Sequence, residues 1–311
     1  MKKVIPVFRV VIKAFANLKA NDPIRMAAAT AFFSFFALPP IIIILSQLYG
    51  ELLDDQNQRV SWQLFRELAD LFGRQSARQL QDISQHLQQR RSSDLLTALS
   101  VLLLLLASTT LFAIIKSSLN QLWNVKLSAN RRFWHLALDK VVALGIIVFS
   151  GFLFTASLAI HRVLAPLKEY LFLSTFLNEW TTNAGNHFLS VSMLTVWFAA
   201  VFKYLPDIRI HWQAVWVGAL VTAVLVEAGE QLLDRLLIKS PVSSLYGRSG
   251  AIILILLFVF YASLIFYYGA SFTRQYAQWI HREPEPGAHA VAYQIKEVPT
   301  ENPNLDQEPN R

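Results

Sequence analysis

Residues 26–50 read MAAATAFFSFFALPPIIIILSQLYG, a stretch that contains no Asp, Glu, Lys or Arg. A helix rises about 1.5 Å per residue and the hydrocarbon layer of a bilayer is about 30 Å thick, so about 20 apolar residues cross it. This stretch is too long for the apolar core of a cleaved signal peptide, and it lacks the small-x-small site at which such a peptide is cut. We therefore expect it to stay in the protein as a membrane anchor.

Five further stretches have the length and composition of spanning helices. Residues 95–115, 141–161 and 249–273 also lack charged side chains, whereas 183–203 ends on a lysine and 212–234 includes three acids. Together with the first stretch they predict an all-α, polytopic membrane protein with six transmembrane helices.

The overall composition favours a membrane protein over a soluble enzyme. Of the 311 residues, 54% are hydrophobic and 16% are charged, whereas an average soluble domain has about 25% charged residues. The chain contains no cysteine, which excludes disulfides, thiolate nucleophiles and Cys-ligated zinc. The apolar residues must therefore face lipid rather than water.

Three segments are expected outside the bilayer, around or within a membrane domain of residues 26–280. The leader, residues 1–25, is rich in Lys and Arg and is expected in the cytoplasm. Residues 57–93 carry apolar stripes of helical period, which predict an extracytoplasmic amphipathic helical hairpin. The tail, residues 281–311, contains Glu-Pro-Glu-Pro-Gly and then lacks periodicity, which predicts disorder.

The distribution of basic residues predicts the orientation of the six helices. Loops rich in Lys and Arg stay on the cytoplasmic side of a membrane. With six spans, 17 of the 28 basic residues lie in the leader, the second and fourth connections and the tail. Both termini are therefore expected in the cytoplasm.

Three acids near the end of the fifth predicted span are the most informative polar positions. Glu227, Glu230 and Asp234 have i, i+3, i+7 spacing and so lie on one helical face. An ionised carboxylate at membrane depth is costly unless it is paired, protonated or hydrated, so a transport pathway is one interpretation. A structural ion pair is the other. The candidate counter-ions are Arg25, Lys203 and Arg235.

Pro39 and Pro40 fall in the middle of the first predicted span. Each removes a backbone donor, which predicts a kink or a break in the helix. Broken helices at membrane depth line polar cavities in many transporters, but prolines also occur as plain kinks. Both interpretations stay open.

The sequence predicts no cofactor, no metal site and no enzymatic activity. Its seven histidines include no i, i+4 pair, and the phosphate-binding motif Gly-x-x-x-x-Gly-Lys-[Ser/Thr] is missing. The net charge of +7 comes from basic residues beside apolar segments, a placement that favours anionic head groups over nucleic acid. Membrane lipids are therefore the expected partners.

Five stretches, in order along the chain, are similar to a known family: DPIRMAAATAFFSFFALPP (22–40), SLNQLWN (118–124), YLPDIRIHW (204–212), YGRSGA (246–251) and YGASFTRQYA (268–277). They resemble the YihY/BrkB family of bacterial inner-membrane proteins. The resemblance implies six spans, cytoplasmic termini and the bacterial inner membrane, but no defined activity. Some members have carried the label ribonuclease BN and others a virulence or serum-resistance label. Nothing in this sequence supports a nuclease, since it lacks metal ligands and a solvated RNA-binding face.

Two functional hypotheses from different classes fit these observations. The leading hypothesis is a transport or lipid-handling protein, based on the acidic face beside the proline-containing first helix. The alternative is a structural or scaffolding protein that recruits an envelope protein partner through residues 57–93, or that forms a homo-oligomer. An enzyme acting on a lipid comes third.

Reporter fusions test the predicted topology. Because basic connections stay in the cytoplasm, fusions after Arg131 and within the tail should show cytoplasmic activity. Fusions near Gln75 and Glu169 should show activity on the opposite side. A cytoplasmic signal from Gln75 would contradict the whole assignment.

Overall fold

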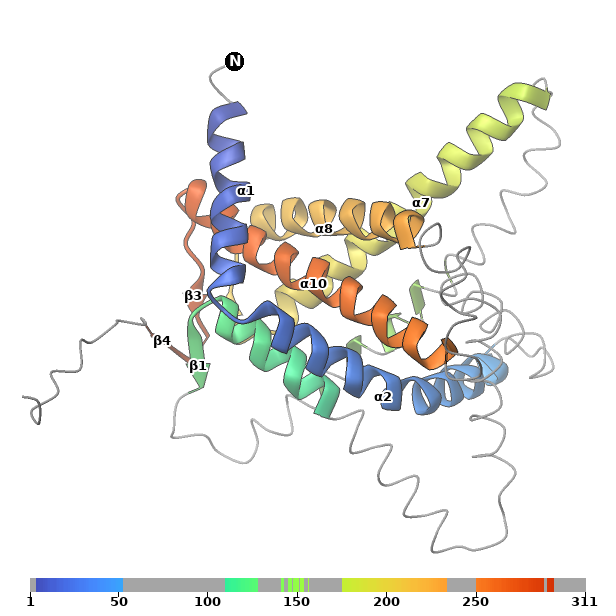
Figure 1. Ribbon diagram of the computed structural model, residues 1–311, viewed down its shortest axis with the longest axis horizontal. Helices are drawn as coiled ribbons and strands as arrows, with labels where there is room; N and C mark the ends of the chain where they lie inside the picture. The colour runs from blue at the N-terminus through green and yellow to red at the C-terminus, as the bar shows by residue number, and fades with distance from the viewer. Residues whose placement is uncertain are drawn as a thin grey trace, which may run out of the picture.

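A computed structural model of the protein describes residues 4–52, 110–127, 141–142, 145–146, 148–150, 152–153, 156, 175–233, 250–287 and 290–293. Within these residues, helices form a bundle that carries short strand pairs at one end (Figure 1). Residues 110–122 are also helical. The other elements are α1 (Val4–Lys19), α2 (Pro23–Leu52), β1 (Val125–Leu127), α7 (Thr175–Tyr204), β2 (Ile208–Arg209), α8 (Trp212–Leu233), α10 (Gly250–Trp279), β3 (Glu285–Pro286) and β4 (Ala290–Ala292).

Three helices in the described part of the chain are long and apolar enough to cross a membrane. They are α7 from His187, α8 over its whole length and α10 from Ile252. They overlap the predicted spans 183–203, 212–234 and 249–273, and α10 continues beyond the last of these to Trp279. Helix α7 begins earlier than predicted, at Thr175, because a charge such as that of Glu179 ends an apolar stretch without ending a helix.

The first predicted span, residues 26–50, lies within α2. This helix continues without interruption through Pro39 and Pro40, so the two prolines do not divide it into two helices, and a bend there stays a prediction. The predicted hairpin, residues 57–93, lies outside the described residues. The predicted spans 95–115 and 141–161 are described only in part and are helical where they are described. A total of six spans therefore stays a prediction.

Helices α8 and α10 approach most closely where glycines meet threonines. Gly218 of α8 lies against Thr273 of α10, and Gly269 of α10 lies against Thr222 of α8, so closely that a Cβ on either glycine would overlap the threonine hydroxyl. Each hydroxyl donates to the carbonyl of the glycine one turn earlier in its own helix, at 2.7 Å. The four residues thus form a reciprocal contact of the small-residue kind that brings membrane helices together.

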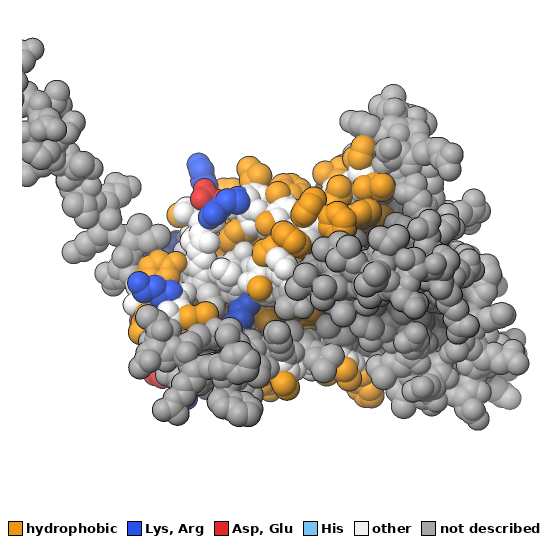
Figure 2. All heavy atoms as spheres, turned by 90° about the horizontal axis from the view of Figure 1, so that it is seen from below, with side chains coloured by type: hydrophobic (Ala, Val, Ile, Leu, Met, Phe, Trp, Pro, Cys, Tyr) orange, Lys and Arg blue, Asp and Glu red, His pale blue; other side chains and the backbone are white. Residues whose placement is uncertain are grey.

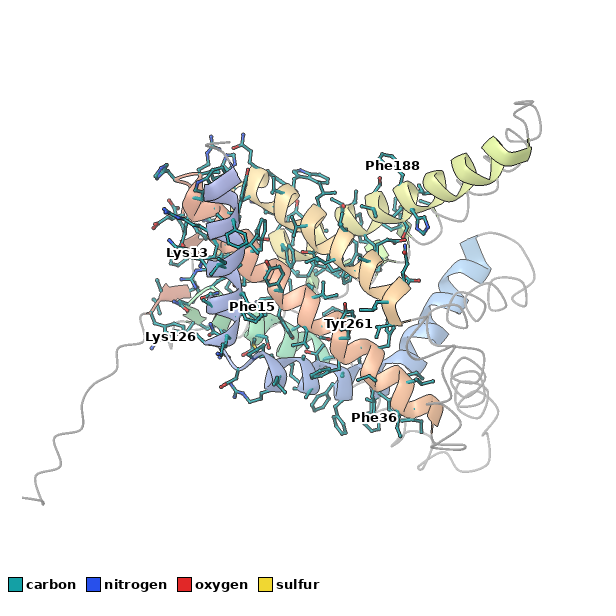
Figure 3. All side chains as sticks on the ribbon, turned by 45° about the horizontal axis from the view of Figure 1, so that its top comes forward. Lys13, Phe15, Phe36, Lys126, Phe188 and Tyr261 are labelled. Atoms are coloured by element: carbon teal, nitrogen blue, oxygen red, sulfur yellow. The ribbon has the colours of Figure 1, made fainter. Side chains whose placement is uncertain are left out.

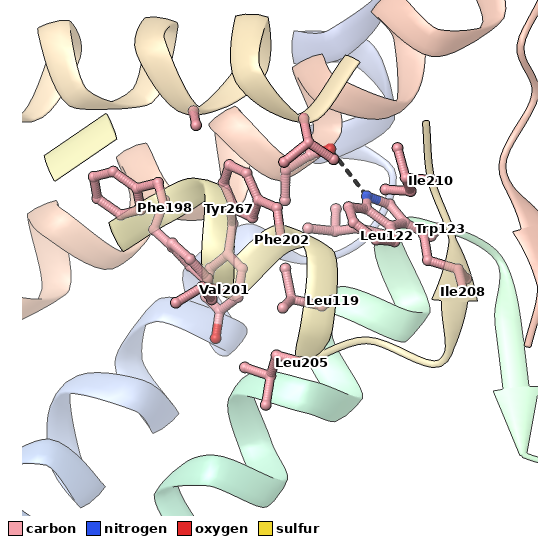
Figure 4. Packing of buried hydrophobic residues seen from close by; sticks show 14 of the residues in the cluster. Leu119, Leu122, Trp123, Phe198, Val201, Phe202, Leu205, Ile208, Ile210 and Tyr267 are labelled. Atoms are coloured by element: carbon pink, nitrogen blue, oxygen red, sulfur yellow. Dashed lines mark hydrogen bonds between the residues drawn. The ribbon is translucent and has the colours of Figure 1, made fainter. Parts of the chain in front are cut away.

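The apolar core lies between α7, α8, α10 and residues 110–122 (Figure 4). Leu119 and Phe202 are completely buried there, beside Tyr267. The polar atoms of the buried aromatic residues have partners: Trp123 Nε1 donates to the Ala270 carbonyl at 2.9 Å, and Tyr267 Oη lies 2.6 Å from Thr30 Oγ1. These two bonds tie Trp123 and α2 to α10 and give the polar atom of each of these two aromatic side chains a partner.

Two antiparallel strand pairs join segments that are distant in sequence. β1 pairs with β4, and β2 pairs with β3. The prediction of disorder from residue 281 is therefore wrong for β3 and β4. Composition predicts whether a segment can order itself, but these strands obtain their hydrogen bonds from connections more than seventy residues away.

Four segments meet at the end of the bundle that carries the strand pairs: the leader, the second connection, the fourth connection and the tail. The predicted topology places all four on one side of the membrane. The strand pairs bring together the second connection, the fourth connection and the tail. The leader forms α1, a helix that was not predicted, and Asn17 of α1 donates to the Leu122 carbonyl at 3.3 Å. We call this the connection end. Its position in the cytoplasm stays a prediction.

Substitution of the interlocked glycines should destabilise the fold. Gly218→Ala or Gly269→Ala should lower the free energy of unfolding by about 1–3 kcal/mol, the usual cost of overpacking, which a melting temperature in detergent would detect. Gly185→Ala is the matched control, because a Cβ there meets nothing within 4 Å. An equal loss of stability in the control would contradict the contact.

Candidate functional site

The candidate site surrounds the carboxylate of Glu227, between α8 and α7. Glu227 Oε1 lies 2.6 Å from His187 Nδ1, and Oε2 accepts a hydrogen bond from Ser190 Oγ at 2.7 Å. His187 and Ser190 are three residues apart and so lie on one face of α7. Both oxygens of this acid are therefore bound by the neighbouring helix. We call these three residues the Glu227 cluster.

The cluster lies deep along both helices. Glu227 follows Trp212, the first residue of α8, by 15 residues, which is roughly 22 Å at 1.5 Å per residue. His187 precedes the end of α7 at Tyr204 by 17 residues, which is roughly 26 Å. Because α7 and α8 are joined by the short segment at 205–211, both helices carry the cluster far from the connection end.

The two partners differ in exposure. The Glu227 side chain is 14% exposed, whereas the His187 side chain is 56% exposed. Phe188 beside it also points outward, on the upper side of α7 in Figure 3. A half-enclosed carboxylate is thus connected through an imidazole to the outside of the bundle. Such a pair can bind a cation or pass a proton.

The predicted counter-ions lie elsewhere. Lys203 donates to the Ile210 carbonyl at 2.5 Å and lies 5.4 Å from the centre of the Trp212 ring, both at the connection end. Arg25 pairs with Asp22 at 3.6 Å, with both side chains largely exposed. The structure therefore does not bring either cation to the acidic face.

The other predicted acids are placed only in part. Glu230 is half-buried on α8, one turn beyond Glu227. Asp234 and the third candidate counter-ion, Arg235, lie outside the described residues. Within the described part of the chain, no group of three or more His, Asp or Glu side chains could hold a metal ion.

His187 and Ser190 were not predicted as site residues. The missed signal is that His187 is itself an ionisable residue within a predicted span, which is a functional candidate by the same rule that selected Glu227. The rotation of α7 that turns it toward α8 depends on packing, which a single sequence does not give.

A second polar cluster lies at the connection end, around Asp207. Its carboxylate lies 2.8 Å from Lys116 Nζ and accepts a bond from Asn120 Nδ2 at 2.8 Å. Its backbone amide donates to Asn120 Oδ1 at 2.9 Å, and its carbonyl accepts from the Gly287 amide at 2.8 Å. This acid therefore holds residues 110–122, the fourth connection and the tail together.

Comparison with known proteins places the chain in a family. The model of the family described as virulence factor BrkB matches residues 14–294. The chain belongs to the BrkB family. The match reaches from within α1 to beyond β4, so the strand pairs of the connection end are part of the BrkB region.

Several curated relatives are named UPF0761 membrane proteins. The relative from Teredinibacter turnerae is 23% identical over 257 residues, which are 82% of this chain and 57% of the relative. One from Idiomarina loihiensis is 21% identical over 76% of this chain and 78% of its own length. One from Vibrio cholerae is 26% identical over 57% of this chain and 58% of its own length. This chain thus spans little more than half the length of the Teredinibacter relative. No solved structure matches this chain.

The BrkB-family chain is therefore an integral membrane protein. Its apolar helices and the names of its relatives agree on this point. Those names specify a membrane location and no activity. Any more specific function must be inferred from the chemistry of the Glu227 cluster.

A double-mutant cycle tests the contact between Glu227 and His187. We expect Glu227→Gln and His187→Gln to be coupled by about 0.5–2 kcal/mol in the free energy of unfolding, as is usual for polar pairs between membrane helices. The control cycle pairs Glu227→Gln with His211→Gln at the connection end, where the effects should add. Coupling of equal size in both cycles would rule out a specific contact.

Proposed function

We propose that this protein is a transporter or lipid-handling protein of the bacterial inner membrane, with six spans, cytoplasmic termini and Glu227 in its polar pathway. The observation that carries the proposal is the engagement of both Glu227 oxygens by His187 and Ser190, combined with the exposure of the imidazole. An ionisable residue within a membrane helix is a functional candidate, commonly in an ion or proton pathway.

The charge balance of the cluster supports a pathway over a structural ion pair. The hydroxyl of Ser190 is neutral, and the imidazole of His187, unlike a lysine or arginine side chain, is not a permanent cation. Glu227 can therefore alternate between binding His187 and binding a cation or a cationic head group. A permanent lysine or arginine partner would hold it in one state.

Reconstitution into liposomes tests the proposal with two probes. One assay measures movement of a fluorescent phospholipid between leaflets by its accessibility to a reductant that does not cross the bilayer. The other measures proton flux with a pH-sensitive dye in the liposome lumen. We expect wild-type protein to accelerate at least one process over empty liposomes. Glu227→Gln should reduce that rate severalfold, with a loss of stability no larger than its coupling to His187.

Asp22→Asn is the matched control, because it also converts one acid to its amide but lies at an exposed turn. Asp22 has a φ of 52°, a conformation that Asn adopts easily, so the rate should be unchanged. Wild-type protein that moves neither probe would reject the proposal. A Glu227→Gln protein with a lowered melting temperature and a normal rate would instead assign the cluster a structural role.

A further inference from the structure

Helix α1 has three distinct faces. Val10, Ala14 and Leu18 are buried, and Val10 and Ala14 pack against Phe272 of α10. A second face is apolar but exposed, with i, i+3, i+4, i+7 spacing: Phe8 64%, Val11 37%, Ile12 52% and Phe15 61%. Between these faces lie two exposed cations, Arg9 and Lys13. We call the second face the outer apolar face.

α1 is fixed to the bundle by polar bonds as well as by packing. Ser271 Oγ donates to the Ala14 carbonyl at 2.8 Å, and Asn17 Nδ2 donates to Ser271 Oγ at 2.9 Å. Arg274 Nη1 lies 3.3 Å from Asn17 Oδ1. These bonds hold the helix across the direction of α8 and α10, near the connection end (Figure 1). The outer apolar face is therefore a fixed surface.

Exposed aromatic side chains lie at the same end of the bundle as α1. Four aromatic side chains lie at the ends of α7, α8 and α10 that are nearest to the connection end. They are 42–58% exposed: Tyr204, Trp212, Trp216 and Trp279. Tyr204 and Trp212 contact each other, as do Trp212 and Trp216, with ring centres 6.2 Å apart in each pair. Trp and Tyr gather where head groups meet acyl chains. α1 thus lies at the depth of a membrane interface.

The positive charge of α1 favours lipids with anionic head groups. Its sequence contains Arg9, Lys13 and Lys19 and no acid. Lys13 lies on the side of α1 away from the bundle, and Phe15 on a different side (Figure 3). Basic side chains also gather at this end in the view of Figure 2. A helix with cations flanking an apolar face lies in the interface of an anionic leaflet.

We propose that α1 is an interfacial helix whose outer apolar face enters the acyl chains of an anionic leaflet while Arg9 and Lys13 bind the head groups. The bilayer is the occupant of this surface. The helix thereby binds phosphate-bearing lipids beside the bundle, independently of the Glu227 cluster.

The natural lack of cysteine permits a direct test in the full-length protein. An environment-sensitive fluorophore is attached to Phe15→Cys or to Lys13→Cys, and the protein is placed in nanodiscs that contain spin-labelled lipids. We expect strong quenching at position 15 and weak quenching at position 13. Both positions are exposed, so neither label should disturb the fold.

The head-group preference is tested at position 15 with spin-labelled phosphatidylglycerol and phosphatidylcholine. Phosphatidylglycerol should quench severalfold more, and Arg9→Gln with Lys13→Gln should abolish the difference. The matched control, Lys126→Gln with Arg209→Gln, removes two exposed cations from the same end and should preserve it. Equal quenching at positions 13 and 15, or no preference in the wild type, would overturn the proposal. Cross-linking between two Phe15→Cys chains without lipid quenching would also overturn it, because a second copy would then cover the face.

Discussion

The close contact between α8 and α10 determines the arrangement of the other described helices. Lipid is as apolar as a leucine side chain, so burial of apolar surface does not draw spanning helices together, and close packing must do so. The glycines at 218 and 269 let two backbones meet at the threonines of the opposite helix. α7 then packs on α8, while α1 and α2 pack on α10. The polar cluster on one side and the interfacial helix on the other both depend on this contact.

Two carboxylates in the described structure show how neighbours set the role of an acid. Asp207 is held by a lysine, an asparagine and backbone groups, so its charge is balanced by a permanent cation and its geometry is fixed. Glu227 is held by a hydroxyl and an exposed imidazole, neither of which is a permanent cation. The first arrangement suits a structural joint. The second suits a group that must change partners.

The sequence predicted what depends on local composition. The limits of α8, and the position of Glu227 along it, follow from counting apolar residues at a fixed rise. It did not predict α1, whose 16 residues are too few to span a membrane and whose apolar positions serve two faces at once. The strand pairs and the partners of Glu227 were missed for a different reason. They depend on contacts between distant segments and on the rotation of one helix about its axis, and no local pattern encodes either.

The pairing of the tail with earlier connections has a consequence for biogenesis. β1 and β2 leave the ribosome before α10, whereas their partners β4 and β3 follow it. The connection end therefore cannot close while the protein is being synthesised and its last described helix is still entering the bilayer. Until then β1 and β2 present unpaired backbone groups to the aqueous phase, where nascent chains are exposed to chaperones and proteases. Closure of both strand pairs therefore requires the chain through Ala292, and a chain arrested before residue 285 lacks the partners of both β1 and β2.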